Sequence, residues 1–71
     1  MTIEAFMQEP PKDAIARIRT EYFEMPGLKL TANQVRRLCG LPVEECERAL
    51  EVLVDARFLA QSRDGAFVLR G

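Results

Sequence analysis

The sequence of 71 residues predicts a mainly helical domain with a small β-hairpin near its C-terminal end. Three stretches repeat apolar residues every three or four positions, the spacing that gives a helix one apolar face. Gly40 lies between the second and third of these stretches, and glycine commonly ends a helix. Asp64-Gly65 separates two short apolar stretches, which is typical of a hairpin turn. With 48% hydrophobic and 30% charged residues, the chain has the composition of a folded domain.

The first predicted helix covers residues 11–24, where Pro11 is tolerated in the first turn. Its apolar residues form one stripe that we expect to face the core: Ile15, Ile18, Tyr22 and Met25. Pro26 disfavours helical geometry in the residue before it, and Gly27 permits a turn. The helix is therefore expected to end at this point.

The second predicted helix covers residues 32–39. Thr31 is a good N-cap residue, and Gln34, three residues later, completes a capping box. Leu30 and Val35 have the spacing of a hydrophobic staple across that cap. The residues of this helix that we expect in the core are Val35, Leu38 and Cys39.

The third predicted helix covers residues 42–56, and Pro42 suits its first position. Its expected core face consists of Val43, Cys46, Leu50, Leu53 and Val54. Its opposite face carries Glu44, Arg48, Glu51 and Asp55, with Glu45 and Val52 beside them. Residues 42–57 contain five acidic residues and two arginines, so this segment has a net charge of −3.

Short strands are predicted at residues 58–61 and 66–70, on either side of the turn at 62–65. Residues 28–30 alternate in a way that favours a third, very short strand. The expected core residues of the hairpin are Leu59, Phe67 and Leu69.

Residues 1–10 are predicted to form a flexible N-terminal arm, and residues 11–71 the folded domain. The arm contains Ile3, Phe6 and Met7, which are more apolar residues than a solvated tail needs. Packing of the arm onto the domain or onto a second copy is one hypothesis, because a small core gains from additional cover. A homodimer formed through the arm or through the first helix follows as a further hypothesis.

The sequence favours a non-enzymatic protein without a cofactor. It has no histidine, no glycine-rich phosphate loop and no nucleophile beside an evident base. Cys39 and Cys46 are seven residues apart, which fits neither a zinc site nor a disulfide scaffold, and we expect both to be buried as small apolar residues. No apolar run approaches about 18 residues, and the N-terminus lacks the pattern of a secretion signal, so we expect a cytoplasmic protein.

The stretch LTANQVRRLCGLPVEECERALEVLVDARFL at residues 30–59, followed by the hairpin sequence, resembles a winged helix-turn-helix domain of the small stand-alone bacterial type. The resemblance covers about residues 12–70 and implies three helices and a two- or three-stranded wing. Arg36 lies four residues before the turn glycine, where compact helix-turn-helix motifs place a small residue, and this favours the looser winged variety.

The resemblance implies double-stranded DNA as the partner and transcription regulation as the function. In this family the second helix of the motif enters the major groove and the wing contacts the flank. The residues that the resemblance places at DNA are Asn33, Arg36, Arg37, Glu44, Glu45, Arg48 and Arg63.

Charge favours an alternative function, in which the same fold docks a protein partner. The net charge of the chain is −1, whereas DNA-binding domains usually carry a basic excess. Glu44 and Glu45 would meet a polyanion at the point of closest approach. The residues expected to form a docking face on the third helix are Glu44, Arg48, Glu51, Val52 and Asp55.

Overall fold

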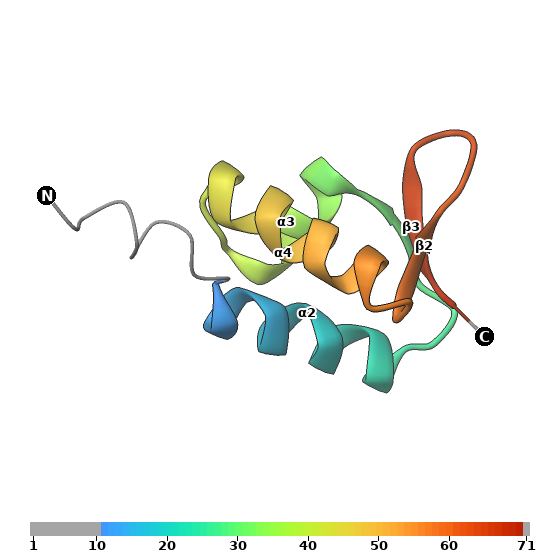
Figure 1. Ribbon diagram of the computed structural model, residues 1–71, viewed down its shortest axis with the longest axis horizontal. Coiled ribbons are helices and arrows are strands. Elements are labelled where there is room, and N and C mark those ends of the chain that lie inside the picture. Colours follow the sequence, from blue (N-terminus) through green and yellow to red (C-terminus); the bar gives the residue numbers. More distant parts are fainter. Residues whose placement is uncertain (1–10, 71) are drawn as a thin grey trace, which may run out of the picture.

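The computed structural model describes residues 11–70, and in this part of the chain three helices combine with a small three-stranded antiparallel sheet (Figure 1). The elements in chain order are α2 (Lys12–Glu24), β1 (Lys29–Thr31), α3 (Ala32–Cys39), α4 (Val43–Asp55), β2 (Leu59–Gln61) and β3 (Ala66–Leu69). This layout is compatible with a winged helix. The predicted arm at residues 1–10, with Ile3, Phe6 and Met7, lies outside the described residues.

The sheet has the strand order β1-β3-β2, so the last strand along the described chain is the central one. Phe67 on β3 is opposite Leu30 on β1 and opposite Gln61 on β2. The strand predicted at residues 28–30 is confirmed as β1, shifted by one residue toward the C-terminus. It joins the hairpin into a single antiparallel sheet.

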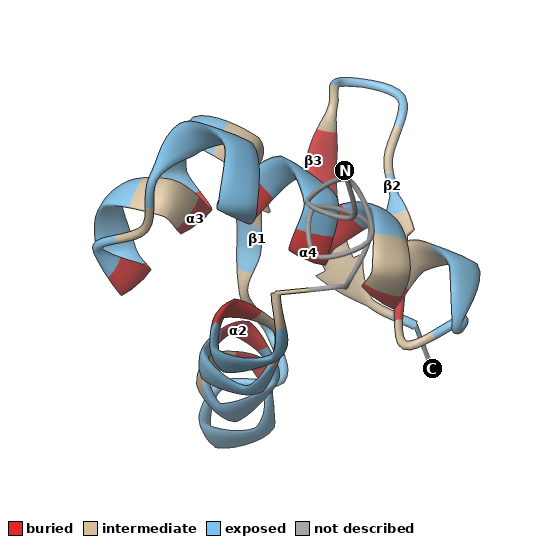
Figure 2. Cartoon of the chain, turned by 60° about the vertical axis from the view of Figure 1, so that its left-hand side comes forward, coloured by how far each residue is buried: buried red, intermediate tan, exposed pale blue. Residues whose placement is uncertain are grey.

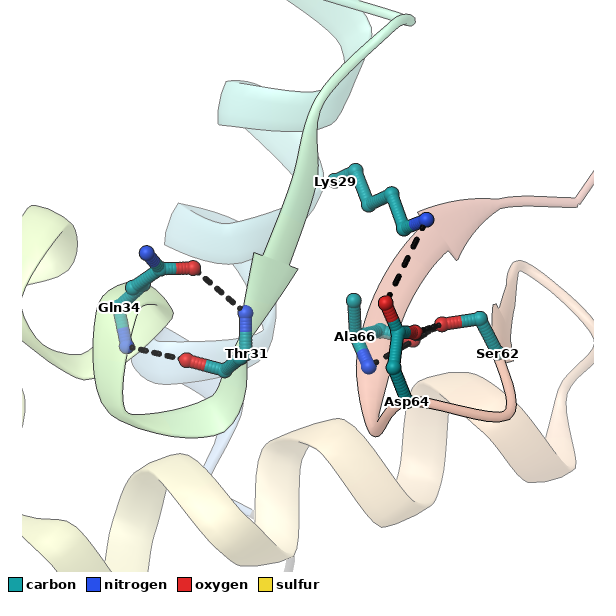
Figure 3. Close-up of polar contacts among 6 residues, drawn as sticks. All are labelled: Lys29, Thr31, Gln34, Ser62, Asp64 and Ala66. Carbon is teal, nitrogen blue, oxygen red and sulfur yellow. Dashed lines mark hydrogen bonds and ion pairs between the residues drawn. The ribbon is translucent and has the colours of Figure 1, made fainter.

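The capping box at the start of α3 is confirmed (Figure 3). The backbone N–H of Gln34 donates to the hydroxyl of Thr31 at 3.3 Å, and the backbone N–H of Thr31 donates to the Gln34 side-chain carbonyl at 2.9 Å. At the other end of the helix, Gly40 has a left-handed backbone with φ of 65°. Glycine adopts this conformation without steric cost, so it allows the sharp turn toward α4.

The end of α4 has no glycine and still uses a left-handed residue. Arg57 has φ of 63°, and its N–H donates to the carbonyl of Val54 at 3.0 Å. The N–H of Phe58 donates to the carbonyl of Leu53, also at 3.0 Å. These two bonds form a Schellman motif, with arginine at the position that is usually glycine. The motif turns the chain directly from α4 into β2.

One core lies between the three helices and the sheet, with the buried residues on the inward surfaces of the elements (Figure 2). It consists of Ala14, Ile18, Tyr22, Val35, Cys39, Cys46, Ala49, Leu50, Leu53, Leu59 and Phe67. Tyr22 is only 1% exposed, and its hydroxyl donates to the backbone carbonyl of Phe67 at 2.7 Å. This bond connects α2 to the central strand.

Three residues predicted in the core are exposed instead. Met25 is 56% exposed because it follows the last residue of α2, and its backbone, with φ of −133°, has left the helical path. Leu38 is 48% exposed, since α3 buries only its Val35–Cys39 edge. Val43 is 51% exposed because the contact of α4 with the core begins one turn later, at Cys46.

Three other predicted core residues lie at the edge of the core, where they are partly buried and pack against it: Ile15, Val54 and Leu69. Leu30, the predicted staple residue, is placed in the same way. Val52, which was expected on the exposed face of α4, is partly buried. Two small residues that no pattern singled out, Ala14 and Ala49, are almost fully buried. Their small side chains permit close approach of α2 and α4 to their neighbours.

Replacement of Thr31 with alanine should destabilise the protein. The substitution removes the oxygen that accepts the Gln34 N–H, so we expect the free energy of unfolding to fall by about 1 kcal/mol. Urea unfolding followed by circular dichroism measures this loss. Thr20→Ala is the control, because the Thr20 hydroxyl only bonds the Ala16 carbonyl within α2, and its loss should change stability by less than about 0.5 kcal/mol. Equal losses in both variants would contradict the capping role.

Tyr22 should ionise at unusually high pH in the folded state. Burial is the main cause that raises the pKa of Tyr22 to about 12, whereas the pKa of tyrosine in an unfolded chain is about 10. The contribution of Tyr22 to stability is therefore complete below about pH 10, and it is lost as the pH rises toward about 12, because the unfolded state releases the proton first.

Tyr22 is the single tyrosine of the sequence, so the ultraviolet absorbance of tyrosinate reports on it alone. Comparison with Tyr22→Phe isolates its effect on alkaline unfolding, because the thiols titrate in both proteins. A native titration midpoint near pH 10 would contradict the burial and hydrogen bonding of this side chain.

Candidate interaction surface

The outward side of α4 is strongly acidic. Five carboxylates and one arginine of this helix are exposed to solvent: Glu44, Glu45, Glu47, Arg48, Glu51 and Asp55. The buried residues of the same helix face the core, so the charged side chains lie on the side of the helix that faces solvent.

The two ends of α4 place their carboxylates in opposite electrostatic settings. Glu44 and Glu45 are in the first turn, where the positive end of the helix dipole stabilises negative charge. Asp55 is in the last turn, which contains no basic residue, and there the dipole disfavours a carboxylate. Helix stability therefore explains the first pair of acids and leaves Asp55 without a structural reason.

A hollow of about 400 Å³ lies beside this acidic end of α4. It is lined by residues of α4, by the first residue of α3 and by the two strands of the hairpin: Ala32, Glu47, Leu50, Glu51, Val54, Asp55, Gln61 and Phe67. A second hollow of about 210 Å³ lies between α3 and the start of α4, and its lining includes Ala32, Asn33, Arg36, Val43, Cys46 and Glu47. The two hollows share Ala32 and Glu47 in their linings, and we refer to them together as the α4 groove.

The residues predicted to contact DNA do not form one patch. Asn33 and Arg36 line one end of the α4 groove, where the Arg36 guanidinium donates to the Asn33 side-chain carbonyl at 3.0 Å. Arg37 is exposed in the last turn of α3. Arg63 is exposed in the hairpin turn, which lies at the opposite end of the molecule from the start of α4 (Figure 1).

Other positive groups are engaged in the fold. Lys29 on β1 forms a salt bridge with Asp64 of the hairpin turn, with 3.6 Å between Nζ and Oδ2 (Figure 3). The pKa of Asp64 is lowered, first by its hydrogen bond from the Ser62 hydroxyl and then by Lys29. The Ser62 hydroxyl also accepts the N–H of Ala66 at 3.2 Å. This cluster holds the hairpin turn against the neighbouring strand.

Arg19 has a structural environment as well. Its guanidinium carbon lies 5.4 Å from the ring centroid of Phe58 and 5.9 Å from that of Phe23. The two rings meet edge to face, with centroids 5.6 Å apart. The guanidinium therefore covers an aromatic pair at the outer edge of α2 through cation–π contact.

Of the residues predicted to form a docking face on α4, Glu44, Arg48, Glu51 and Asp55 are exposed and Val52 is partly buried. The apolar residues that line the hollow beside Glu51 and Asp55 are Ala32, Leu50, Val54 and Phe67. Glu47, which was not among the predicted residues, also lines this hollow. Its spacing of four and eight residues from Glu51 and Asp55 places all three on one side of the helix.

Neither cysteine has the setting of a reactive thiol. Cys39 and Cys46 are free and buried, and burial is the main cause that raises the pKa of each thiol. The Cys46 sulfur lies 3.7 Å from the carbonyl oxygen of Ala32. A raised pKa keeps the thiol protonated, and the thiolate is the nucleophile. Their roles in the structure are those of core residues.

Residues 11–70 contain no group of three or more His, Cys, Asp or Glu residues that could hold a metal ion. Nor do they contain a helix with the length and apolar character needed to cross a membrane. Comparisons with family models, with curated proteins and with solved structures give no match for this chain.

Proposed function

We propose that this chain is a non-enzymatic winged-helix domain that docks a protein partner through the exposed side of α4. The observation that carries the proposal is the position of Glu51 and Asp55. Both line a hollow with an apolar floor. Asp55 also lies in the last turn of the helix, where negative charge is disfavoured. A charge that costs the helix stability and borders an apolar hollow fits a binding surface better than a purely solvating one.

The same carboxylates are poor candidates for catalysis. A catalytic acid or base requires a pKa matched to its task, which proteins achieve through burial and close neighbours. The carboxylates of α4 are exposed, and no histidine is present in the sequence to act with them. This supports a binding role without a chemical step or a cofactor.

Double-stranded DNA is the second candidate partner, with a role in transcription regulation. The observation that favours it is the exposure of Arg37 and Arg63, with Arg36 at the end of the groove, because phosphate contacts supply much of DNA affinity. Against it, Glu44 and Glu45 occupy the start of α4, where a winged helix presents its base-reading residues. Repulsion between these carboxylates and phosphate places DNA second.

Binding to labelled mixed-sequence duplex, measured by fluorescence anisotropy, distinguishes the two candidates. At about 50 mM salt we expect no saturable binding by the natural chain. We expect Glu44→Lys/Glu45→Lys to gain salt-dependent binding, because the change removes the repulsion and adds two cations at the expected contact surface. Saturable binding by the natural chain that Arg36→Glu/Arg37→Glu abolishes would overturn the proposal in favour of DNA.

Protein docking predicts a specific loss when the acidic end of α4 is reversed. A partner recovered by affinity capture and then purified should bind the natural chain, and Glu51→Lys/Asp55→Lys should weaken that binding about tenfold or more. Asp13→Lys/Glu24→Lys is the matched control, since both residues are exposed on α2 and the change in net charge is the same. Equal weakening by both variants would argue against a docking surface on α4.

A further inference from the structure

We propose that the α4 groove binds a short segment of a partner protein in which a large apolar side chain lies between arginine or lysine residues. This inference rests on the proposed docking function and names the chemistry of the partner. It commits to the larger hollow, between α4 and the hairpin, as the place where that segment sits.

The floor of the hollow is apolar and is built from three different elements. Phe67 comes from the central strand, Leu50 and Val54 come from α4, and Ala32 comes from the start of α3. Phe67 and Leu50 are buried parts of the core, so they give the floor a fixed shape. The volume of about 400 Å³ is within the range of roughly 300–1,000 Å³ that is common for binding pockets. An apolar side chain placed here would be removed from water.

The rim on the α4 side is a row of three carboxylates. Glu47, Glu51 and Asp55 are four residues apart, so successive members are separated by about 6 Å along the helix. The whole row spans about 12 Å, which an extended peptide covers in roughly four residues. Gln61, on the hairpin side of the hollow, is uncharged. A segment of four to six residues would thus bring two or three cations within reach of the row.

The carboxylates of the row are available to a partner. The salt bridge found within residues 11–70 joins Lys29 to Asp64, and it leaves out Glu47, Glu51 and Asp55. Asp55 also faces the negative end of its own helix dipole. A cation bound beside Asp55 would compensate both the carboxylate and the helix end, so this position favours a basic residue in the partner.

The negative charge of the rim also disfavours other occupants of the hollow. A nucleic acid would bring phosphates next to three carboxylates. Residues 1–10 of the chain contain apolar residues, but they carry two glutamates and no lysine or arginine. Neither a nucleic acid nor residues 1–10 would complement the negative charge of the rim. A basic segment with an apolar residue would complement both the charge of the rim and the apolar floor.

Titration of the isotopically labelled full chain with the synthetic peptide GRLRFRG, followed by NMR, tests the inference. We expect saturable shifts of backbone signals that concentrate on Glu51, Val54, Gln61 and Phe67. Two control peptides separate the contributions, since GRGRGRG lacks the apolar side chains and GELEFEG reverses the charges. We expect each to bind about tenfold more weakly or not at all. Equal binding of GRGRGRG, shifts confined to α2, or no shift with GRLRFRG would overturn the proposal.

Two variants with the same change in net charge provide the decisive comparison. Glu51→Lys/Asp55→Lys should weaken binding of GRLRFRG about tenfold or more. Asp13→Lys/Glu24→Lys should weaken it much less, because both residues are exposed on α2 and neither lines the hollow. Equal weakening would show attraction to the overall charge and overturn the assignment of the hollow. Thermal unfolding checks that both variants fold, and Asp55→Lys removes an unfavourable charge from the end of α4.

The outcome is separable from that of the proposed function. If a purified partner loses affinity for Glu51→Lys/Asp55→Lys while no basic peptide occupies the hollow, this inference is overturned and docking through α4 stands. If no partner depends on α4 but the peptide still binds in the hollow with the expected controls, the docking function fails as proposed while the chemical preference of the hollow is supported.

Discussion

The bond from the Tyr22 hydroxyl to the Phe67 carbonyl links the helices to the sheet. It connects residues 45 positions apart in the sequence and lies within the core. Phe67 sits on the central strand, opposite residues of both outer strands, so this bond holds α2 to the strand that pairs with the other two. The hollow beside α4 depends on the same placement, because Phe67 forms part of its floor.

The charges at the two ends of α4 have opposite effects on the stability of the helix. At its start, Glu44 and Glu45 support the helix through the dipole, whereas at its end Asp55 works against it. Natural proteins commonly accept a less stable arrangement where a site needs it. Under the proposed function, the acidic end of α4 gives up a small amount of helix stability and gains a surface that would select cationic partners. The surface where Arg19 covers the Phe23–Phe58 pair shows no such conflict between packing and charge.

Local chemistry made much of the fold predictable from sequence. The Thr31–Gln34 cap and the left-handed Gly40 depend on residues close in the chain, and the structure confirms both. Burial at the ends of helices was less predictable, as Met25 and Val43 show, because it depends on where neighbouring elements stop. The left-handed Arg57 lacked the usual glycine that would indicate it. The hollow could not be predicted at all, since it requires Phe67 and Gln61 to lie beside a helix that precedes them in the chain.

Because β3 is the central strand, the sheet cannot pair until β3 has been synthesised. A ribosome produces β1 and β2 before β3, so neither outer strand has its partner until residues 66–69 have emerged. Thr31 on β1 pairs with Ala66 on β3, which lies 35 positions later in the chain. A nascent chain that has reached only Gln61 contains all three helices and two strands with unsatisfied edges. The Tyr22 hydroxyl also lacks its acceptor at that stage, so neither the complete sheet nor its bond to α2 can form before residues 66–69 have been made.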